Sequence, residues 1–367
     1  MERTDKIHFY LRTLKELREG TVLNFEDPEG ILNVMNEDVR SAFLANPNNY
    51  ADDEICQIIA LDGNVVVGSV LSFANKYLAD GKIRDCRGAS TLFVSEKYRK
   101  LMIGADLMIQ AATIIPGQDN IVAGISQVAY PIYKAMRYAC FSMPRYIFLK
   151  KSRTVIESIF RSRNIFTRSV SLLFDIFLLI YRALLYLVIC KKGFIMEMSK
   201  DVPDEVEMIF NEDNHKYKEL HNKDWYIWNL QNSFNHNPRN RKNLYVIKKN
   251  GKIVAFYILK IEFFESISSR GFKDVTLATI SEWGIKKGCN LSEYDLHLLA
   301  IKNSPKQVDG IQVATTDQLT SKKYRRSLFI PMGIANNAVL MTSIKDKDIR
   351  RIENWRLRIA AGDTLLN

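Results

Sequence analysis

The sequence repeats a hairpin pattern. Residues 57–71 read QIIALDGNVVVGSVL and residues 245–259 read YVIKKNGKIVAFYIL, so two apolar runs flank an Asp-Gly pair in the first segment and an Asn-Gly pair in the second. Such a pair between apolar runs is a strong signal for a β-hairpin. Each segment therefore predicts two antiparallel strands.

Two further matches follow the hairpins in the same order. ASTLFV at 89–94 matches LATISE at 277–282, and a later pair of segments aligns at Tyr133 and Tyr324. Similar pieces that share one order and a nearly constant spacing predict two copies of one fold.

The repeat suggests how the 367 residues divide. We expect a first domain at 1–150, an apolar helical linker at 151–198, a second domain at 199–350 and a C-terminal tail at 351–367. The expected fold class is α/β, with two tandem mixed-sheet domains joined by the linker. The stretch from Lys345 onwards is expected to form a helix followed by a polar tail.

The linker contains the longest apolar run, SVSLLFDIFLLIYRALLYLVIC at 169–190. Residues 134–200 hold thirteen basic and three acidic residues, which accounts for nearly all of the net charge of +11. A general nucleic-acid surface would spread such charge over a folded face, so we expect no nucleic-acid partner.

Three structures compete for this run. About 20 apolar residues can span a bilayer, but Asp175 and Arg182 lie inside the run, and charges are costly there. They are seven positions apart and project from nearly the same side of a helix, which leaves one wide apolar face. This disfavours a span. It leaves open a helix in the interface of an anionic membrane, contacted through 151–192, and a helix packed between domains or against a second subunit as a homodimer.

Residues 91–115 predict a strand, a tight basic loop and a helix. A helix N-terminus offers unpaired N–H groups and a partial positive charge, which suit a phosphate. Gly104 allows a ligand close to the backbone, and Arg99 and Lys100 add charge at the same place. These residue properties indicate an anion-binding site. The alternative is an ordinary strand-to-helix junction whose basic side chains are solvated.

The loop VSEKYRKLMIGADLM also resembles the acyl-CoA loop of the GNAT N-acetyltransferase superfamily. That family holds the CoA pyrophosphate on backbone amides with the motif Arg/Gln-x-x-Gly-x-Gly/Ala. Arg99, Met102 and Gly104 stand at the motif positions, and Met102 replaces the first glycine. The second half of the chain has no such motif and resembles a degenerate copy. The tandem arrangement resembles bacterial acyltransferases of polysaccharide biosynthesis.

Residues 126–138, SQVAYPIYKAMRY, resemble the second signature of the family, Asn-x-x-Ala-x-x-x-Tyr-x-x-x-Gly-Phe, at Ala129 and Tyr133. The resemblance implies that Tyr133 is the catalytic general acid, which protonates the departing thiolate. It also implies a set of residues that bind acetyl-CoA or another acyl-CoA as co-substrate: Phe93, Val94, Arg99, Lys100, Leu101, Met102, Ile103, Gly104 and Ala105.

The resemblance leads us to expect an acyl-CoA-dependent N-acyltransferase that modifies a primary amine, such as an amino sugar of surface-polysaccharide synthesis. The usual general base is missing, because Ser90 and Thr91 stand where relatives often carry Glu. A membrane-peripheral binding or scaffold protein with an inactive acyltransferase fold is therefore the alternative.

Other sites are not indicated. The five histidines show no His-Glu-x-x-His spacing, so we expect no metal. The five scattered cysteines and a charged N-terminal stretch without an apolar core favour a cytoplasmic protein, at the inner membrane face if the linker contacts lipid.

Overall fold

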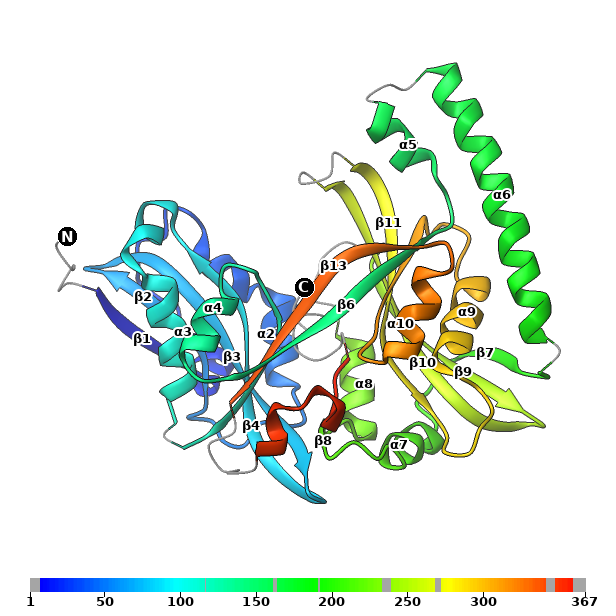
Figure 1. Cartoon of the computed structure of the whole chain (residues 1–367). Coiled ribbons are helices and arrows are strands. Elements are labelled where there is room, and N and C mark those ends of the chain that lie inside the picture. Colours follow the sequence, from blue (N-terminus) through cyan, green and yellow to red (C-terminus); the bar gives the residue numbers. More distant parts are fainter. Residues whose placement is uncertain are drawn as a thin grey trace. The chain divides into compact units, whose positions relative to one another are not determined.

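The computed structural model describes residues 7–115, 117–160, 164–190, 192–232, 239–267, 272–340 and 347–358. The chain forms two compact units, and Figure 1 shows the order of their elements. Unit 1 comprises Met1–Ser142, His215–Asn235 and Asn336–Asn367, and unit 2 comprises Met143–Asn214 and His236–Ala335. The sequence predicted continuous domains, whereas each unit consists of separate segments.

Unit 1 is built on a mixed sheet. Neighbouring strands in the order β1-β2-β3-β4 are antiparallel, and β4 and β5 are parallel. The short strand β8 extends the sheet at the far end of β3, and β14 pairs with β8. The strands are β1 (Ile7–Thr13), β2 (Ile55–Asp62), β3 (Val65–Ala79), β4 (Lys82–Val94), β5 (Asp119–Ile125), β8 (Tyr217–Glu219) and β14 (Trp355–Arg356).

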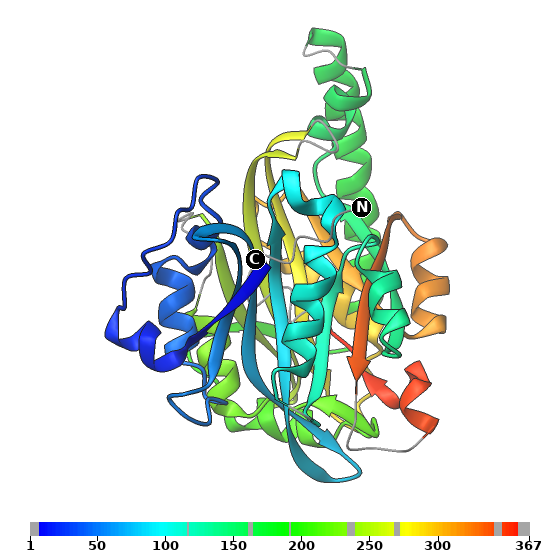
Figure 2. The same ribbon diagram turned by 90° about the vertical axis from the view of Figure 1, so that its left-hand side faces the viewer.

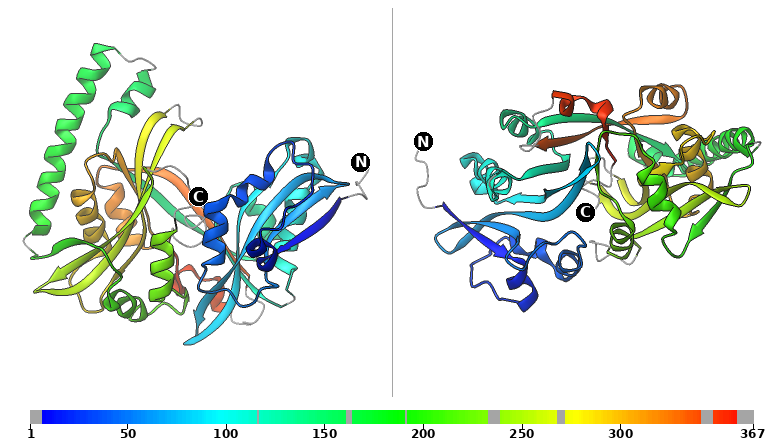
Figure 3. Two further views of the ribbon diagram at one scale, coloured as in Figure 1. Left: turned by 180° about the vertical axis from the view of Figure 1, so that it is seen from behind. Right: turned by 90° about the horizontal axis from the view of Figure 1, so that it is seen from below.

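Helices cover both faces of this sheet: α3 and α4 lie on one face and α1 and α2 on the other (Figures 1 and 3). The α3 side chains Ile103, Leu107 and Ala111 pack on apolar residues of β2 and β3 to form one core cluster. The helices are α1 (Leu14–Glu19), α2 (Glu37–Leu44), α3 (Ile103–Thr113), α4 (Tyr130–Ala135) and α8 (Lys223–Gln231), with the 3₁₀ turns η1 (Ile31–Met35), η2 (Glu96–Leu101), η4 (Lys347–Arg350) and η5 (Ile352–Asn354).

Unit 2 repeats this plan. Its strands run in the order β7-β9-β10-β11-β12, antiparallel except for the parallel pair β11–β12. The strands are β7 (Ile195–Ser199), β9 (Arg241–Lys249), β10 (Lys252–Ile267), β11 (Phe272–Ile285) and β12 (Gly310–Ala314). The helices are α5 (Arg153–Phe160), α6 (Ile165–Cys190), α7 (Asp204–Asn211), α9 (Glu293–Asn303) and α10 (Gln318–Arg325). The two predicted copies of one fold are confirmed.

Both predicted hairpins are present. The Asn250-Gly251 turn joins β9 to β10 as predicted, whereas Asp62 still pairs with Val65, so the turn between β2 and β3 is formed by Gly63 and Asn64. Asn250 and Gly251 have φ of 51° and 76°, a left-handed conformation that Asn and Gly adopt more readily than other residues.

Two strands connect the units and complete both sheets. β6 (Ala139–Leu149) leaves unit 1 and pairs antiparallel with β12 in unit 2. β13 (Phe329–Leu340) leaves unit 2, and its residues from Asn336 onwards pair antiparallel with β5 in unit 1. Each sheet therefore contains a strand from the other half of the sequence.

The predicted linker and tail also belong to the folded units. Within 151–198, α5 and α6 pack on each other, and α6 packs on α9, so both helices are part of unit 2. Residues 347–358 form two 3₁₀ turns and β14 instead of the expected helix. Trp355 explains this difference, because its buried indole packs between Phe141 and Tyr217 in unit 1. Residues 359–367 of the predicted tail lie outside the described residues.

Candidate active site

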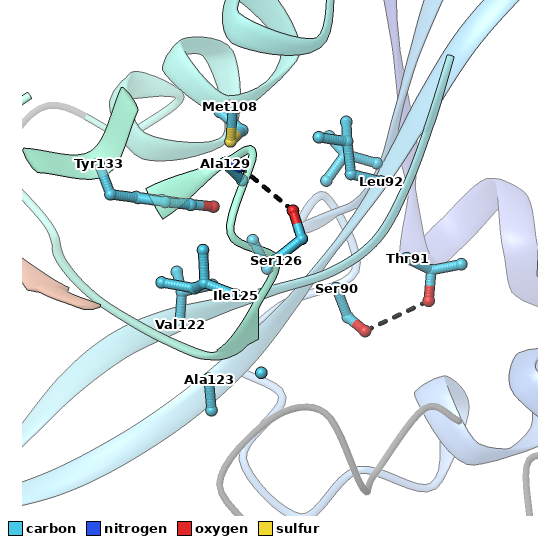
Figure 4. Close-up of a pocket in the computed structure, with 13 residues that line it drawn as sticks. Ser90, Thr91, Leu92, Met108, Val122, Ala123, Ile125, Ser126, Ala129 and Tyr133 are labelled. Carbon is cyan, nitrogen blue, oxygen red and sulfur yellow. Dashed lines mark hydrogen bonds between the residues drawn. The ribbon is translucent and has the colours of Figure 1, made fainter. Parts of the chain in front are cut away.

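The parallel strands β4 and β5 diverge along their length. They pair only where Cys86 faces Asp119 and Arg87 faces Asn120. Beyond these pairs, residues from both strands line a cavity of about 250 Å³ instead of bonding to each other. The cavity is lined by Val70, Ala89, Ser90, Thr91, Leu92, Met108, Val122, Ala123, Gly124, Ile125, Ser126, Ala129 and Tyr133 (Figure 4).

A β-bulge lies in each wall of the cavity. In β4, the register shifts between the pairs Ser69–Phe93 and Leu71–Ser90, which leaves one extra residue in that strand. Thr91 in this bulge has φ of 51°, an uncommon conformation for a β-branched residue. In β5, a second register shift lies between Val122 and Ile125 and includes Gly124, with φ of 68°. Because a bulge leaves one residue unpaired, both walls can turn backbone groups towards a ligand.

Tyr133 lines the cavity with its phenol side chain. It lies in α4, its ring packs edge to face on Tyr138, and only 5% of the residue is exposed. Figure 4 shows its hydroxyl directed towards Ser126 and the interior of the cavity. Burial raises the pKa of Tyr133, so the phenol stays protonated at neutral pH. A protonated hydroxyl in a cavity is suited to donate a proton.

The predicted loop lies directly after the diverging strand. The chain leaves the sheet after the amide of Ser95 donates to the Val67 carbonyl, passes through η2, and enters α3 at Ile103. The side chains of the loop separate into two groups. Arg99, Lys100 and Met102 are exposed, and Phe93 is 37% exposed at the end of β4.

The other predicted loop residues turn inwards. Ile103 is a member of the core cluster beneath α3, Val94 and Leu101 pack against that cluster, and Ala105 is buried. The loop is therefore held by its apolar side chains, and its basic side chains and backbone face outwards.

The bend between η2 and α3 presents backbone donors. Met102 has φ of 64°, which explains why a glycine suits this position, and the residue is 57% exposed. The amides of Met102, Ile103 and Gly104 donate to no acceptor within the described chain, and no side chain caps α3. The amide of Ala105 donates to the Met102 carbonyl at 2.8 Å, so this predicted donor is occupied. Three consecutive free N–H groups beside Arg99 and Lys100 are suited to bind an anion, and we call this bend the predicted anion site.

Gly104 lies where the loop meets the cavity. Its φ is not positive, so its backbone does not require glycine. A Cβ at this position would lie 3.5 Å from the Val94 side chain and 3.9 Å from the Leu92 side chain, both ordinary contacts. Leu92 also lines the cavity, so the predicted anion site and the cavity are adjacent.

Several residues that shape this site were not predicted from the sequence to do so. Thr91 and Gly124 shape the walls through their backbones, and Met108 lines the cavity from α3. A glycine inside a strand is a general sign of a bulge or a close approach and could have indicated Gly124. No local signal marks Thr91, because its conformation depends on the pairing of β4 with β3.

Comparison with known proteins extends these observations. No family model matches the sequence, and no curated protein matches it significantly. Solved structures do match. Saccharomyces cerevisiae N-myristoyltransferase with bound myristoyl-CoA is 13% identical, with a TM-score of 0.57, 92% of this chain covered and 83% of the other.

Two bacterial structures match over similar lengths. A GCN5-related N-acetyltransferase from Anabaena variabilis is 12% identical, with a TM-score of 0.52, and the match covers 92% of this chain and 73% of the other. A conserved protein of Enterococcus faecalis, described as a probable N-acyltransferase, is 10% identical, with a TM-score of 0.50 and the same coverages, 92% and 73%. This chain has a tandem GNAT-like fold. At these identities the likeness establishes the fold, and the site must support any activity.

Proposed function

We propose that the protein is an N-acyltransferase that transfers an acyl group from acyl-CoA to a primary amine. The observation that carries the proposal is that, in unit 1, the free amides of Met102, Ile103 and Gly104 lie next to the cavity that contains the Tyr133 hydroxyl, with Leu92 between Gly104 and the cavity. A diphosphate fits the first feature, and a thioester that needs a proton donor fits the second.

The residues present fit acyl-CoA as co-substrate. The amides at 102–104 would hold the pyrophosphate, with charge from Arg99 and Lys100. The pantetheine arm would lie along Phe93 and Val94, where β4 has no partner on the β5 side. The acyl carbonyl would then lie near the bulge at Thr91, whose unpaired backbone could stabilise the oxyanion.

Transfer then requires attack and collapse. The neutral amine would attack the thioester carbon, the C–S bond would break, and the thiolate would take the Tyr133 proton. The ammonium nitrogen of the tetrahedral intermediate would lose one proton to solvent, and the tyrosinate would regain one from solvent. None of the residues lining the cavity in the described part of the chain is a carboxylate, so we assign no base. The donor in this proposal is acetyl-CoA or a longer acyl-CoA, and amino sugars are the first acceptor class to test.

Calorimetric titration tests the donor. Acetyl-CoA, myristoyl-CoA and free CoA are titrated into the full chain, and each should bind, with the acyl chain changing the affinity. Absence of binding by all three to folded protein would refute the proposal. Binding without turnover across a panel of amino sugars and amino acids would instead favour an inactive acyltransferase fold that serves as a binding protein.

Two lysine variants test whether the loop before α3 binds the CoA pyrophosphate. Lys100→Ala removes an exposed charge next to the free amides and should weaken CoA binding about fivefold to tenfold, as expected for one charge-assisted contact. Lys82→Ala removes an equally exposed charge at the opposite end of β4 and serves as the matched control. Equal effects of the two substitutions would show that the loop does not hold the pyrophosphate.

A further inference from the structure

Helix α6 presents an unusual apolar surface. It has 26 residues, a length of about 39 Å, and by length and composition it could cross a membrane. Its outward side chains are strongly exposed, including Leu173 at 70%, Leu184 at 58% and Ile180 at 55%. We call the side formed by Leu172, Leu173, Ile176, Leu179, Ile180, Leu184 and Leu187 the outer face of α6. An exposed apolar surface of this kind marks an interaction site.

The opposite side of α6 is attached to unit 2. Ser152 binds this side at two places, since its amide donates to Asp175 at 2.6 Å and its hydroxyl to the Ser171 carbonyl at 3.1 Å. Further along, Tyr181 stacks on Phe148 of β6. Figures 1, 2 and 3 show α6 running along unit 2, and it contacts α9. A membrane span would have to break these contacts, so the outer face is available to a surface and not to a bilayer crossing.

A basic cavity lies at the edge of the outer face. It has a volume of about 260 Å³ and is lined by Lys150, Lys151, Leu179, Arg182, Ala183, Lys302, Ser304 and Lys306. Five of these residues are basic and none is acidic. Leu179 lines the cavity and is also 57% exposed on the outer face, so the two features are continuous.

The positive charge in this cavity is only partly compensated. Lys151 pairs with Asp309 at 3.0 Å, but the ammonium group of Lys150 contacts only neutral oxygens of Ser304 and Pro305. The Nε of Arg182 is buried and has no acceptor among the described residues. Burial, together with Arg182 and Lys151 nearby, lowers the pKa of Lys150 to about 8. An anion in the cavity would relieve this repulsion.

We propose that unit 2 docks on an anionic phospholipid membrane, with the outer face of α6 in the interface and one lipid phosphate in the basic cavity. The occupant follows from the combination of features: an apolar face alone could contact another protein, but a phosphate site that opens onto that face matches a headgroup joined to acyl chains. The docking places the enzyme at a lipid surface and does not depend on acyl transfer.

Vesicle flotation with the full chain tests the proposal. The protein should float with vesicles of phosphatidylcholine that contain phosphatidylglycerol, and much less with phosphatidylcholine alone. High salt should weaken the binding, because the headgroup contact is electrostatic. Failure to float with either vesicle would overturn the proposal.

Two double variants separate the cavity from the outer face. Lys302→Glu/Lys306→Glu should weaken binding by at least about fivefold per lysine. Lys286→Glu/Lys287→Glu makes the same charge change at two exposed lysines that do not line the cavity and should bind like the wild type. Leu173→Glu/Ile180→Glu should abolish flotation while the circular dichroism and the thermal midpoint stay unchanged, because both residues point away from unit 2.

Two other results would assign the surface differently. Calorimetric binding of inorganic phosphate without flotation would make the cavity a site for a free anion. A dimer that Leu173→Glu/Ile180→Glu converts to a monomer, without flotation of the wild type, would make the outer face a contact with a second copy. Either result overturns the membrane proposal and leaves the acyltransferase proposal untouched.

Discussion

The two units share one fold but differ at the helix N-terminus that follows the long hairpin and at the corresponding tyrosine. In unit 1, α3 begins at Ile103, and its N-cap residue, Met102, makes no side-chain cap. In unit 2, α9 begins with a capping box, in which Ser292 and Asp295 satisfy each other's backbone amides. Asp295 also binds Lys192 at 2.6 Å. Side chains of the protein therefore satisfy the N-terminal amides of α9 in unit 2, whereas α3 in unit 1 has no such cap.

The tyrosines differ in the same way. Tyr133 directs its hydroxyl into a cavity, whereas the Tyr324 hydroxyl hydrogen-bonds to His297 and its ring packs against Tyr294 and Phe329. Both strands before the helices carry a bulge, at Thr91 in β4 and at Ser281 in β11. Both copies of the fold therefore have the bulge and the tyrosine, and only unit 1 has the uncapped helix end and the cavity to which we assign acyl-CoA in our proposal.

The sharpest test of this difference exchanges each tyrosine for phenylalanine. Tyr133→Phe should lower kcat by about 100-fold or more and leave CoA affinity nearly unchanged, because it removes only the proton donor. Tyr324→Phe should leave kcat unchanged and lower the free energy of unfolding by about 1 kcal/mol, because it removes the hydrogen bond to His297. Steady-state kinetics and chemical denaturation measure the two effects. A similar loss of kcat in both variants would end the functional distinction.

The pH profile follows from the raised pKa of Tyr133. A general acid must be protonated, and burial keeps this phenol protonated above the usual tyrosine pKa of about 10. We therefore expect no decline of kcat from loss of this proton between about pH 7 and pH 10, and an alkaline decline shared with Tyr133→Phe would come from another group.

Gly104→Ala should weaken CoA binding and at the same time raise the thermal stability of the protein. A methyl group makes ordinary contacts with Val94 and Leu92, and alanine favours a helix over glycine by about 0.5–1 kcal/mol, so the thermal midpoint should rise. The same methyl group lies between the free amides and the cavity and should weaken CoA binding about tenfold, the effect of losing one hydrogen bond to a charged group. Calorimetry and thermal denaturation measure both, and unchanged affinity would move the pyrophosphate away from this bend.

Ser292→Ala tests the capped helix of unit 2. Loss of this N-cap should lower the free energy of unfolding by about 1 kcal/mol. CoA affinity should not change, because the capped end binds no ligand. A gain of CoA binding in this variant would show that the cap is what closes a second site.

The smallest expected effect is that of Met102→Gly. Removing a Cβ from the left-handed conformation should stabilise the fold by less than about 1 kcal/mol, and the backbone amide is retained. CoA affinity should therefore stay within about threefold of the wild type by calorimetry. A large loss of affinity would mean that the Met102 side chain itself contacts the nucleotide.

The sequence was sufficient for the local features. The two hairpins, the strand-loop-helix at 91–115 and the doubling of the fold follow from turn chemistry and short-range periodicity, and all are present, although the first hairpin turns at 63–64 and not at 62–63. Tyr133 and Gly104 could be singled out by resemblance, and their roles remain predictions.

The long-range features could not be read from the sequence. The unusual backbone at Thr91 depends on how β4 pairs with β3, and the exchange of β6 and β13 depends on contacts between residues up to about two hundred positions apart. Local patterns carry no information about such pairings.

The late-arriving segments of unit 1 have a consequence for biosynthesis. Residues 1–142 reach the ribosomal exit before the strand at 336–340 and the buried Trp355 that complete their sheet and core have been translated. The nascent N-terminal half must therefore wait, with β5 lacking its neighbour, until residues 336–340 and Trp355 have been translated. A premature stop codon before residue 336 would therefore leave the half of the protein that is encoded first without a strand of its sheet.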